Sequence, residues 1–478
     1  MRKRTKIITT LGPSTTDPKT LTELISAGTD VFRLNLSHAK IEEAKGIIKK
    51  LKVSSLKLKR PVAMLVDLQG QKIRVKGFFK KEFIDLETNQ KFVLDCSLKD
   101  NEGDASMIGV TYKSLYKTVK PRDEILLSDG LIKLYVDKIK GKKIYTTVVR
   151  GGRLLPFQGL NKKGGGLSLK GLTKKDMSDL KKAVKLDIDY IAVSFVRNKN
   201  DLIAVKKITD KKNIGLIAKV ERNEALENID SILENSDGIL IARGDLGVEI
   251  GIELLPAVQD ELIAKAMDHD KLVIVATQMM ESMKTSRVPT RAEVFDVSNA
   301  ACSGVDAIML SAETAVGQYP AEVVHEASRI CDIAEKTSTK KIKISNSGER
   351  FHKVDQIIAM AAVYGADKSN VEAIAALTET GSTPLWMSRI QSSIPIYAMT
   401  VNEKTSRRIC LYRGVYSIRL NKIEHDHARA NKQVIKLMEK EGAVKKGDLV
   451  IITKGDLMGT SGGTNALKIV EVGNLLKT

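Results

Sequence analysis

Residues 215–247 read GLIAKVERNEALENIDSILENSDGILIARGDLG and contain one complete strand-helix-strand unit. An apolar run at Gly215–Val220 is followed by a polar turn, by helical spacing of apolar residues over Glu224–Leu233, and by a second apolar run at Gly238–Ala242. Such alternation is typical of a parallel sheet, because a crossover helix returns the chain to the edge where the first strand began. The unit therefore predicts parallel strands covered by helices.

The same unit recurs through the first two thirds of the chain. Eight apolar runs rich in valine and isoleucine are separated by polar turns and amphipathic stretches. They are Lys6–Leu11, Asp30–Leu36, Val62–Leu68, Ile188–Phe195, Gly215–Val220, Gly238–Ala242, Lys271–Thr277 and Val305–Leu310. Eight parallel strands are the number that closes a (β/α)8 barrel. We therefore predict an α/β fold built on a TIM barrel.

One connection in this series is much longer than a helix requires. Residues 69–187 separate the third run from the fourth, whereas a crossover with a single helix needs far fewer residues. Within this segment apolar and polar residues alternate, as in Leu131–Val136 and Ile144–Val149, and Asp129-Gly130 is a turn signal. The pattern predicts an inserted small β-barrel or sandwich at residues 70–167.

A further domain is expected after the barrel. The polar stretch Ser345–Glu349 marks a boundary, and helical spacing over Val354–Ala366 then alternates with further apolar runs. This alternation is typical of an open α/β sheet. We expect residues 1–69 and 168–340 to form the barrel, and residues 341–478 to form a C-terminal α/β domain.

The composition narrows the classes of protein to consider. The net charge is +20, but basic residues are interspersed with acidic ones and aromatic residues make up only 4%. We expect no nucleic-acid partner, because proteins of that class gather basic residues on one surface and add stacking aromatics. No apolar stretch reaches the roughly 18 residues of a membrane span, and the four cysteines form no Cys-x-x-Cys pair. We expect a cytoplasmic protein with no membrane partner and no secretion signal.

Charged and polar side chains gather where the apolar runs end. In a (β/α)8 barrel the functional groups stand at the carboxyl ends of the strands. In Lys219-Val220-Glu221 both charged side chains share one face of a strand, and Asp245 follows the next strand. Two carboxylates with substrate oxygens and water are the usual ligands of magnesium. The full set at the strand ends is Arg33, Asn35, Ser37, His38, Asp67, Lys219, Glu221, Arg243, Asp245, Thr277, Gln278, Ser311 and Glu313.

All of these residues except Asp67 lie in segments that resemble pyruvate kinases, and the resemblance covers essentially the whole chain. The matching segments are Thr5–Ile8, Leu11–Pro13, Arg33–His38, Ala218–Arg222, Ala242–Glu249, Ala276–Met283, Pro289–Glu293 and Leu310–Ala315. The resemblance implies a barrel domain A, an inserted domain B that closes as a lid, a C-terminal domain C and a homotetramer. The reaction it implies converts phosphoenolpyruvate and ADP into pyruvate and ATP.

The resemblance also implies how the charged residues act. By similarity, Glu221 and Asp245 hold a divalent ion, Mg2+ or Mn2+, that neutralises developing charge. Lys219 matches the lysine that stabilises the moving phosphoryl group. Arg33 matches the arginine that binds the phosphate of phosphoenolpyruvate with its planar fork.

Other matching residues are expected to bind the rest of the substrates. Thr277 is expected to bind the carboxylate of phosphoenolpyruvate, beside the backbone amides of Gly244 and Asp245. Ser311 and Glu313 lie where the family keeps a water relay that protonates the enolate.

Two residues match positions near the nucleotide phosphates, and a loop in the C-terminal domain matches an effector site. His38 and Lys175 are the nucleotide candidates, each with a merely supporting role as the alternative. The loop residues Thr378, Thr380, Gly381, Ser382 and Thr383 resemble the family's effector-phosphate loop, in which hydroxyls and amides bind phosphate at a helix start. We expect activation by a phosphorylated metabolite, with an ordinary turn as the alternative.

A departure from the family pattern concerns potassium. Members that require the ion usually carry Asp-Thr-Lys-Gly-Pro-Glu where residues 67–72 read DLQGQK, so Lys72 replaces an acid. In those members, side chains like those of Asn35, Ser37 and Asp67 help to coordinate potassium. A Lys72 ammonium near them would supply the same charge and repel the ion. We expect potassium not to be required.

Two other functions remain open at this point. A pyruvate or phosphoenolpyruvate aldolase on a similar barrel would share the metal carboxylates but lack the insert and the Lys219–Glu221 spacing. A basic nucleic-acid-binding protein is the non-catalytic alternative. An assay that detects pyruvate with and without ADP separates all three.

Overall fold

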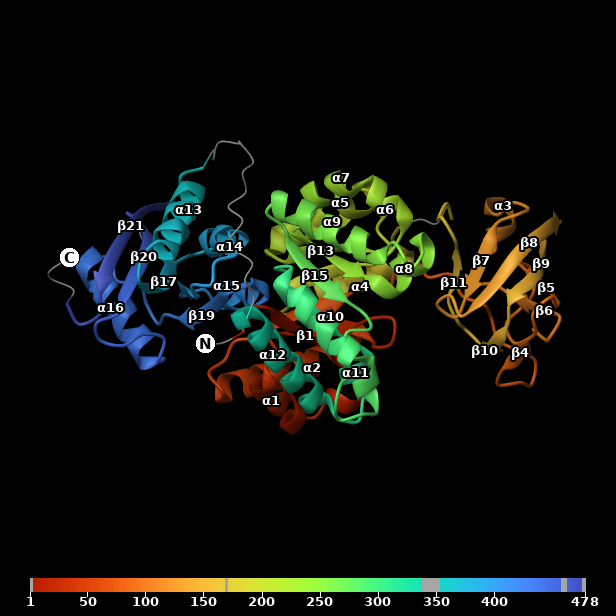
Figure 1. Cartoon of the computed structure of the whole chain (residues 1–478), viewed down its shortest axis with the longest axis horizontal. Coiled ribbons are helices and arrows are strands. Elements are labelled where there is room, and N and C mark those ends of the chain that lie inside the picture. The colour runs from red at the N-terminus through yellow and green to blue at the C-terminus, as the bar shows by residue number, and fades with distance from the viewer. Residues whose placement is uncertain (1–2, 168–170, 338–352, 457–461, 475–478) are drawn as a thin grey trace.

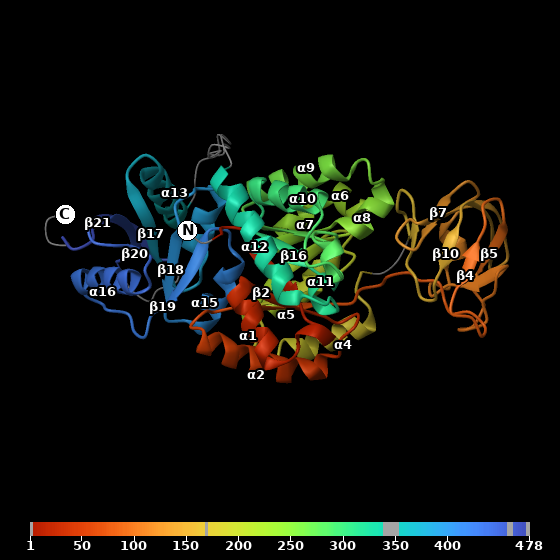
Figure 2. The same ribbon diagram turned by 60° about the horizontal axis from the view of Figure 1, so that its bottom comes forward.

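A computed structural model describes residues 3–167, 171–337, 353–456 and 462–474. Three domains lie in a row, with the barrel in the middle, the insert at one end and the C-terminal domain at the opposite end (Figure 1). Figure 2 shows the same order from a second direction. The predicted boundaries at residues 168 and 341, and the polar stretch Ser345–Glu349, lie outside the described residues.

The central domain is a closed barrel of eight parallel strands, as predicted. The strand order is β1-β16-β15-β14-β13-β12-β3-β2, and each strand coincides with one of the apolar runs. The strands are β1 (Lys6–Thr10), β2 (Val31–Asn35), β3 (Ala63–Asp67), β12 (Tyr190–Val193), β13 (Gly215–Val220), β14 (Gly238–Ala242), β15 (Leu272–Ala276) and β16 (Ala307–Leu310). They are buried because the barrel interior covers one face and the helices cover the other.

Helices surround the barrel and fill the predicted connections. They are α1 (Pro18–Ala27), α2 (Ile41–Lys57), α4 (Lys174–Ala183), α5 (Asn200–Thr209), α6 (Asn223–Glu227), α7 (Ile229–Glu234), α8 (Arg243–Ile250), α9 (Leu255–Asp268), α10 (Arg291–Cys302), α11 (Ala312–Ala315) and α12 (Pro320–Thr337). Asp17 begins α1 by accepting hydrogen bonds from the amides of Lys19 and Thr20. No helix among the described residues is long and apolar enough to cross a membrane.

The helix expected at Glu224–Leu233 is instead two short helices, α6 and α7, that meet at Asn228. The Asn228 side chain donates a hydrogen bond of 2.8 Å to the carbonyl oxygen of Glu224. This bond competes with the backbone ladder, which is why asparagine interrupts helices. The sequence pattern missed the break because both short helices keep their apolar residues on the barrel side.

The insert is built mainly of β-strands, as predicted, and is called the lid domain from here on. Its main sheet has the order β11-β7-β8-β9-β5-β6, and β4 pairs with β10 in a second sheet. Residues 73–76 bond to both edges of the main sheet, through Leu160 N to Ile73 O and Lys76 N to Gly109 O, so the sheet curls toward a small barrel. The elements are β4 (Ile84–Leu86), β5 (Lys91–Asp95), β6 (Met107–Gly109), α3 (Leu115–Thr118), β7 (Glu124–Leu127), β8 (Ile132–Lys140), β9 (Lys143–Arg150), β10 (Gly152–Leu154) and β11 (Leu160–Lys162).

The C-terminal domain is an open α/β sheet of order β19-β18-β17-β20-β21. Its strands are parallel except β21, an antiparallel edge strand that the sequence analysis did not identify. The elements are α13 (Val354–Asp367), β17 (Val371–Leu377), α14 (Ser382–Arg389), β18 (Ile396–Thr400), α15 (Glu403–Arg408), β19 (Val415–Arg419), α16 (His427–Lys440), β20 (Leu449–Gly455) and β21 (Thr464–Glu471).

The C-terminal domain closes the amino-terminal end of the barrel. One hydrophobic cluster contains inward-facing barrel residues such as Ile217 and Leu240 together with Ile409 and Leu411 of the C-terminal domain. Arg389 of α14 forms a buried ion pair with Asp306, which precedes β16. With that end filled, the polar groups at the carboxyl ends of the strands are left on the side of the lid domain.

Candidate active site

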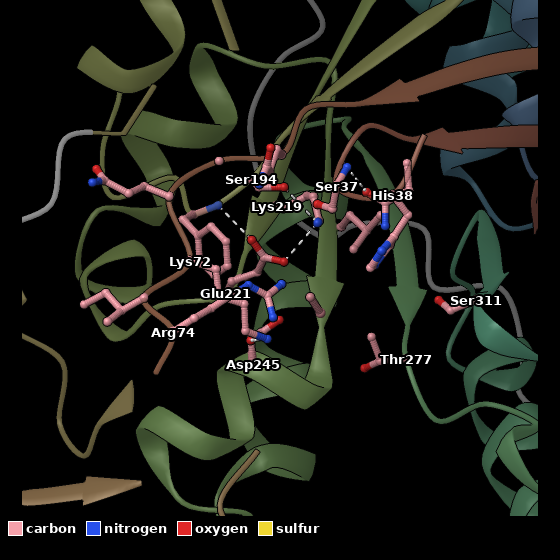
Figure 3. Close-up of a pocket in the computed structure, with 18 of the residues that line it drawn as sticks. Ser37, His38, Lys72, Arg74, Ser194, Lys219, Glu221, Asp245, Thr277 and Ser311 are labelled. Atoms are coloured by element: carbon pink, nitrogen blue, oxygen red, sulfur yellow. Dashed lines mark hydrogen bonds and ion pairs between the residues drawn. The ribbon is translucent and has the colours of Figure 1, made fainter. Parts of the chain in front are cut away.

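A cavity of about 440 Å³ lies at the carboxyl ends of the strands, between barrel and lid domain. The barrel lines it with most of the predicted strand-end residues, and the lid side contributes residues 69–74 together with Thr111 and Tyr112. The predicted residues among its lining are Arg33, Asn35, Ser37, His38, Lys72, Lys219, Glu221, Asp245, Thr277 and Ser311. In Figure 3, Lys72, Glu221 and Asp245 lie close together, with Thr277 and then Ser311 to the right of them.

The carboxylate of Asp67, at the end of β3, joins the two main cations of the site. Its Oδ2 accepts hydrogen bonds from Arg33 Nε at 2.8 Å and Nη2 at 2.6 Å, and lies 3.3 Å from Lys219 Nζ. Burial alone would raise the pKa of Asp67, but the charges of Lys219 and Arg33 hold it below its usual value. Asp67 is therefore a fully buried anion that orients both cations.

Lys219 and Glu221 share one face of β13, as predicted from their spacing. Lys219 Nζ lies 3.0 Å from Glu221 Oε1, and Glu221 Oε2 accepts a 2.7 Å hydrogen bond from the amide of Phe195. Burial opposes the charge of Lys219, but Asp67 and Glu221 raise its pKa above the usual value. Lys219 is therefore held as an ammonium.

Sequence reasoning missed Ser194, which directly follows β12. Lys219 Nζ donates a 2.9 Å hydrogen bond to Ser194 Oγ, and this hydroxyl lies 3.2 Å from Asp67 Oδ1 and 2.8 Å from the carbonyl oxygen of Leu68. The strand-end rule would have found Ser194 had it been applied to the fourth apolar run. Arg74 also lines the cavity but follows no barrel strand, so the rule gives no signal for it.

Glu221 and Asp245 are the two carboxylates that fit a divalent cation. Burial raises the pKa of Glu221, and the nearby charges of Asp245 and Asp67 raise it further while Lys219 opposes the shift. A cation between the two carboxylates would relieve that repulsion. In the part of the chain that the structure describes, no group of three or more His, Cys, Asp or Glu forms a complete metal cage. Substrate oxygens and water would have to complete the coordination.

Lys72 lines the same cavity as Asn35 and Ser37, but its ammonium points to a carboxylate. Lys72 Nζ is 2.8 Å from Asp245 Oδ1 and 3.6 Å from Asp129 Oδ1 of the lid domain. Burial opposes its charge, whereas Asp245 and Asp129 raise its pKa. A fixed positive charge thus stands inside the cavity, although its bonds go to Asp245 rather than to the expected neighbours.

Thr277 and Gly244 come together at the ends of β15 and β14. Thr277 Oγ1 accepts a 2.8 Å hydrogen bond from the amide of Gly244. Thr277 and Gln278 have φ values of +69° and +53°, a left-handed conformation that is costly for β-branched threonine. Arg243 stabilises this turn, because its Nη2 donates a 2.7 Å hydrogen bond to the carbonyl oxygen of Thr277.

Ser311 lines the cavity, whereas Glu313 lies behind it and is completely buried. The Glu313 carboxylate accepts hydrogen bonds from the amides of Ser311 at 2.6 Å and Met280 at 3.2 Å. Burial raises the pKa of Glu313, and these hydrogen bonds oppose the shift. Glu313 therefore holds the backbone of Ser311 and has no direct access to the cavity.

The two nucleotide candidates are placed differently. His38 lines the cavity, and burial together with the charges of Arg74 and Arg33 lowers its pKa, so its imidazole is neutral at pH 7. Lys175 lies beside the cavity, where its Nζ donates hydrogen bonds to the carbonyl oxygen of Leu36 and to Gln69. Only His38 of the pair reaches the cavity lining.

The predicted effector loop borders a second, smaller cavity in the C-terminal domain. Gly381, with a φ of +87°, precedes α14, and its amide donates a 2.9 Å hydrogen bond to Thr378 Oγ1. Thr380 and Ser382 share a hydroxyl hydrogen bond of 2.8 Å, and Thr383 pairs with Thr464 at 2.9 Å. The loop thus brings four hydroxyl groups to the amino terminus of a helix.

Comparison with known proteins accounts for this arrangement. Residues 2–324 match the family description "Pyruvate kinase, barrel domain", and residues 356–470 match "Pyruvate kinase, alpha/beta domain". The chain belongs to the pyruvate kinase family. It is 44% identical to pyruvate kinase II of Salmonella typhimurium and to a pyruvate kinase of Buchnera aphidicola, in each case over 98% of this chain and 99% of the relative. A Haemophilus influenzae pyruvate kinase is 42% identical over 98% and 99%.

Family membership decides among the functions that the sequence left open. The chain is a pyruvate kinase-type transferase rather than an aldolase. The ligands of this family are phosphoenolpyruvate, ADP, ATP and pyruvate, and its members generally use a divalent metal ion.

The shared carboxylate of Asp67 generates a prediction. Asp67→Asn is expected to lower kcat/KM for phosphoenolpyruvate by about a hundredfold or more, because hydrogen bonds to charged groups contribute about 1.5–3 kcal/mol each. Steady-state kinetics with a pyruvate-consuming coupled assay measures the change. Asp85→Asn on the lid surface, whose carboxylate pairs with exposed Arg153, is the matched control and is expected to be near wild type. A value for Asp67→Asn within threefold of the control would contradict this role.

Proposed function

We propose that this protein transfers the phosphoryl group of phosphoenolpyruvate to ADP in the cavity between barrel and lid domain. The observation that carries the proposal is the buried cluster of Arg33, Asp67, Lys219 and Glu221 beside Asp245. It combines fixed cations for a phosphoryl group with two carboxylates for a divalent cation, and these are the parts that phosphoryl transfer requires.

Arg33 and Lys219 are the proposed phosphoryl-binding groups. Of the five N–H donors of a guanidinium, Arg33 uses two on Asp67 and one on Thr10 Oγ1, which leaves two for a ligand in the cavity that it lines. Lys219 stabilises the phosphoryl group in transit, because an ammonium suits a transition state with spread negative charge.

Glu221 and Asp245 would hold Mg2+ or Mn2+, whose chemistry when bound is to neutralise charge that develops on the substrate oxygens. Lys72 would have to release Asp245, to which it is hydrogen-bonded at 2.8 Å. The buried position of Glu221 excludes water from one side of this site.

The remaining residues are assigned to substrate binding and proton delivery. Thr277 and the amides of Gly244 and Asp245 would bind the substrate carboxylate. Ser311, held through its amide by Glu313, would orient a water that protonates the enolate. His38 would meet the nucleotide phosphates, with Lys175 in a supporting position outside the cavity lining.

We further propose that the enzyme does not require potassium. The carboxylate of Asp67 already accepts hydrogen bonds from Arg33 and Ser194 and pairs with Lys219, which leaves little of its charge for another ion. Lys72 adds a positive charge to the cavity that Asn35 and Ser37 line, and like charges repel.

We also propose that a phosphorylated metabolite binds at Thr378–Thr383, where hydroxyls and amides meet the start of α14.

We propose a cytoplasmic homotetramer. Support comes from large apolar side chains on the outer surface of the barrel, because Ile252, Val288 and Phe295 are 76%, 69% and 77% exposed.

Lys219→Met tests the catalytic assignment. It is expected to lower ATP formation by several powers of ten, because the ammonium acts on the phosphoryl group. Exchange of the pyruvate methyl protons with solvent, followed by NMR, is expected to persist because that step needs no phosphoryl stabilisation. Lys265→Met on α9 is the surface control. Near-normal ATP formation by Lys219→Met would refute the assignment.

The potassium proposal predicts equal initial rates in potassium chloride and in tetramethylammonium chloride at matched ionic strength. Lys72→Glu is expected to lose on the order of tenfold in rate without potassium and to recover when the ion is added. Lys91→Glu, on the lid surface, controls for the change of charge. A strong potassium requirement in the unmodified enzyme would end the proposal, and indifference of Lys72→Glu would remove Lys72 from it.

The effector proposal predicts that a sugar phosphate or nucleoside monophosphate lowers the half-saturating phosphoenolpyruvate concentration about fivefold or more. Trp386, the only tryptophan, lies in α14, so its fluorescence should report binding. Ser382→Glu should abolish both responses, because its carboxylate takes the place of phosphate at the helix start. Ser369→Glu, on an exposed turn, should keep them. No response from any such compound would show that this loop is structural.

A further inference from the structure

The chain returns from the lid domain to the barrel through a segment that contacts residues close to both proposed metal ligands, Glu221 and Asp245. This return segment, Asn161–Leu167, contains three consecutive glycines, Gly164, Gly165 and Gly166, with φ values of +80°, +72° and +78°. Such values favour glycine over every other residue, so the segment is built for a particular path across the barrel rim.

Two glutamates of the barrel domain accept hydrogen bonds from this segment. The amide of Gly164 donates a 2.9 Å hydrogen bond to the carbonyl oxygen of Glu249, and the amide of Gly166 donates one of 2.8 Å to Glu224 Oε1. A side chain at Gly165 would lie 3.2 Å from Glu224 Oε2, so the backbone approaches closely. The glycines therefore let the return segment lie directly on the barrel.

Glu249 joins the return segment to both metal-binding loops. It lies on α8, one turn after Asp245, and its Oε2 accepts a 3.0 Å hydrogen bond from the amide of Asn223, two residues after Glu221. The side chain of Asn161 in β11 also bonds to the Glu249 carboxyl group. The buried carboxyl group of Glu249 thus links α8, the helix that contains it, to the lid domain and to the loop after β13.

We propose that Glu249 is a positioning residue that couples the position of the lid domain to the positions of the two metal carboxylates, Glu221 and Asp245. The inference rests on the proposed function, because it gives the lid a role in the same reaction. When the return segment docks, Glu249 fixes Asn223 and α8 at once, so Glu221 and Asp245 take their places together. Undocking the segment would release both.

The raised pKa of Glu249 is consistent with this positioning role. Burial raises its pKa to about 7, against the hydrogen bond from Asn223 and the charge of Arg222, while Glu224 adds to the shift. The charged groups that face it are Arg222 and Glu224, and β11 contributes the neutral Asn161. Undocking would expose the group and return its pKa toward about 4.3. Protonation therefore favours the docked state, and docking weakens as the pH rises through 7.

Hydrogen exchange of the return segment, residues 161–167, in the substrate-free enzyme tests the proposal. After correction for intrinsic rates, Glu249→Ala and Asn161→Ala are expected to exchange about tenfold faster than wild type, since a hydrogen bond to the buried Glu249 carboxyl group is lost. Both should also raise KM for phosphoenolpyruvate and lower kcat together, as expected of hinge variants. Glu253→Gln, an exposed residue just after α8, is the matched control and should change nothing.

The pH dependence separates positioning from mere structural support. Wild-type exchange in this segment should rise between pH 6 and pH 8, whereas Glu249→Gln, which stays neutral, should remain as protected at pH 8 as at pH 6. Exchange in Glu249→Ala equal to that in Glu253→Gln would overturn the proposal. If Glu249→Ala does not fold, the other two variants decide. A wild-type pH response in Glu249→Gln would overturn the proposal, and so would wild-type exchange in Asn161→Ala. Absence of pyruvate formation in the wild type would refute the proposed function and leave the exchange result standing.

Discussion

The site depends on one buried carboxylate that two cations share. Asp67 is fully buried at the end of β3 and binds Arg33 from β2 while pairing with Lys219 from β13. A buried anion is costly unless it is paired and hydrogen-bonded, and a buried cation has the same requirement. Each member of the cluster therefore needs the others, and this mutual requirement fixes three strands of the barrel relative to one another at the point where phosphoryl transfer is proposed.

The barrel can concentrate charge at one end because its other end is filled. Inward-facing residues of the strands pack into the same hydrophobic cluster as the C-terminal domain, and Asp306 at the start of β16 pairs with Arg389 of α14. Arg389 ends the helix that begins at the proposed effector loop. A single helix thus connects that loop with the base of β16, the strand that Ser311 follows.

Much of the fold and part of the site could be predicted from periodicity and position. The eight strands followed from apolar runs, and Lys219, Glu221 and Asp245 followed from the rule that barrel strands carry function at their carboxyl ends. Ser194 was missed although the same rule applies to it. The partner of Lys72 could not be predicted, because its bond to Asp245 joins residues 173 positions apart in the chain. Neither could the role of Glu249, whose contacts come from three separate segments.

The sequence by itself determined most of the side chains that stand at the mouth of the barrel, because strand period and strand ends are local properties of the chain. It also determined the family, through motifs that keep their order and separation. Only the tertiary structure decided which charges pair. Several sets of ion pairs are possible among Arg33, Asp67, Lys72, Lys219, Glu221 and Asp245. One set forms because strand order and the path of the lid bring particular atoms within 3.3 Å. Coulomb energy falls with distance and rises with burial, so that choice depends on packing which no local pattern contains.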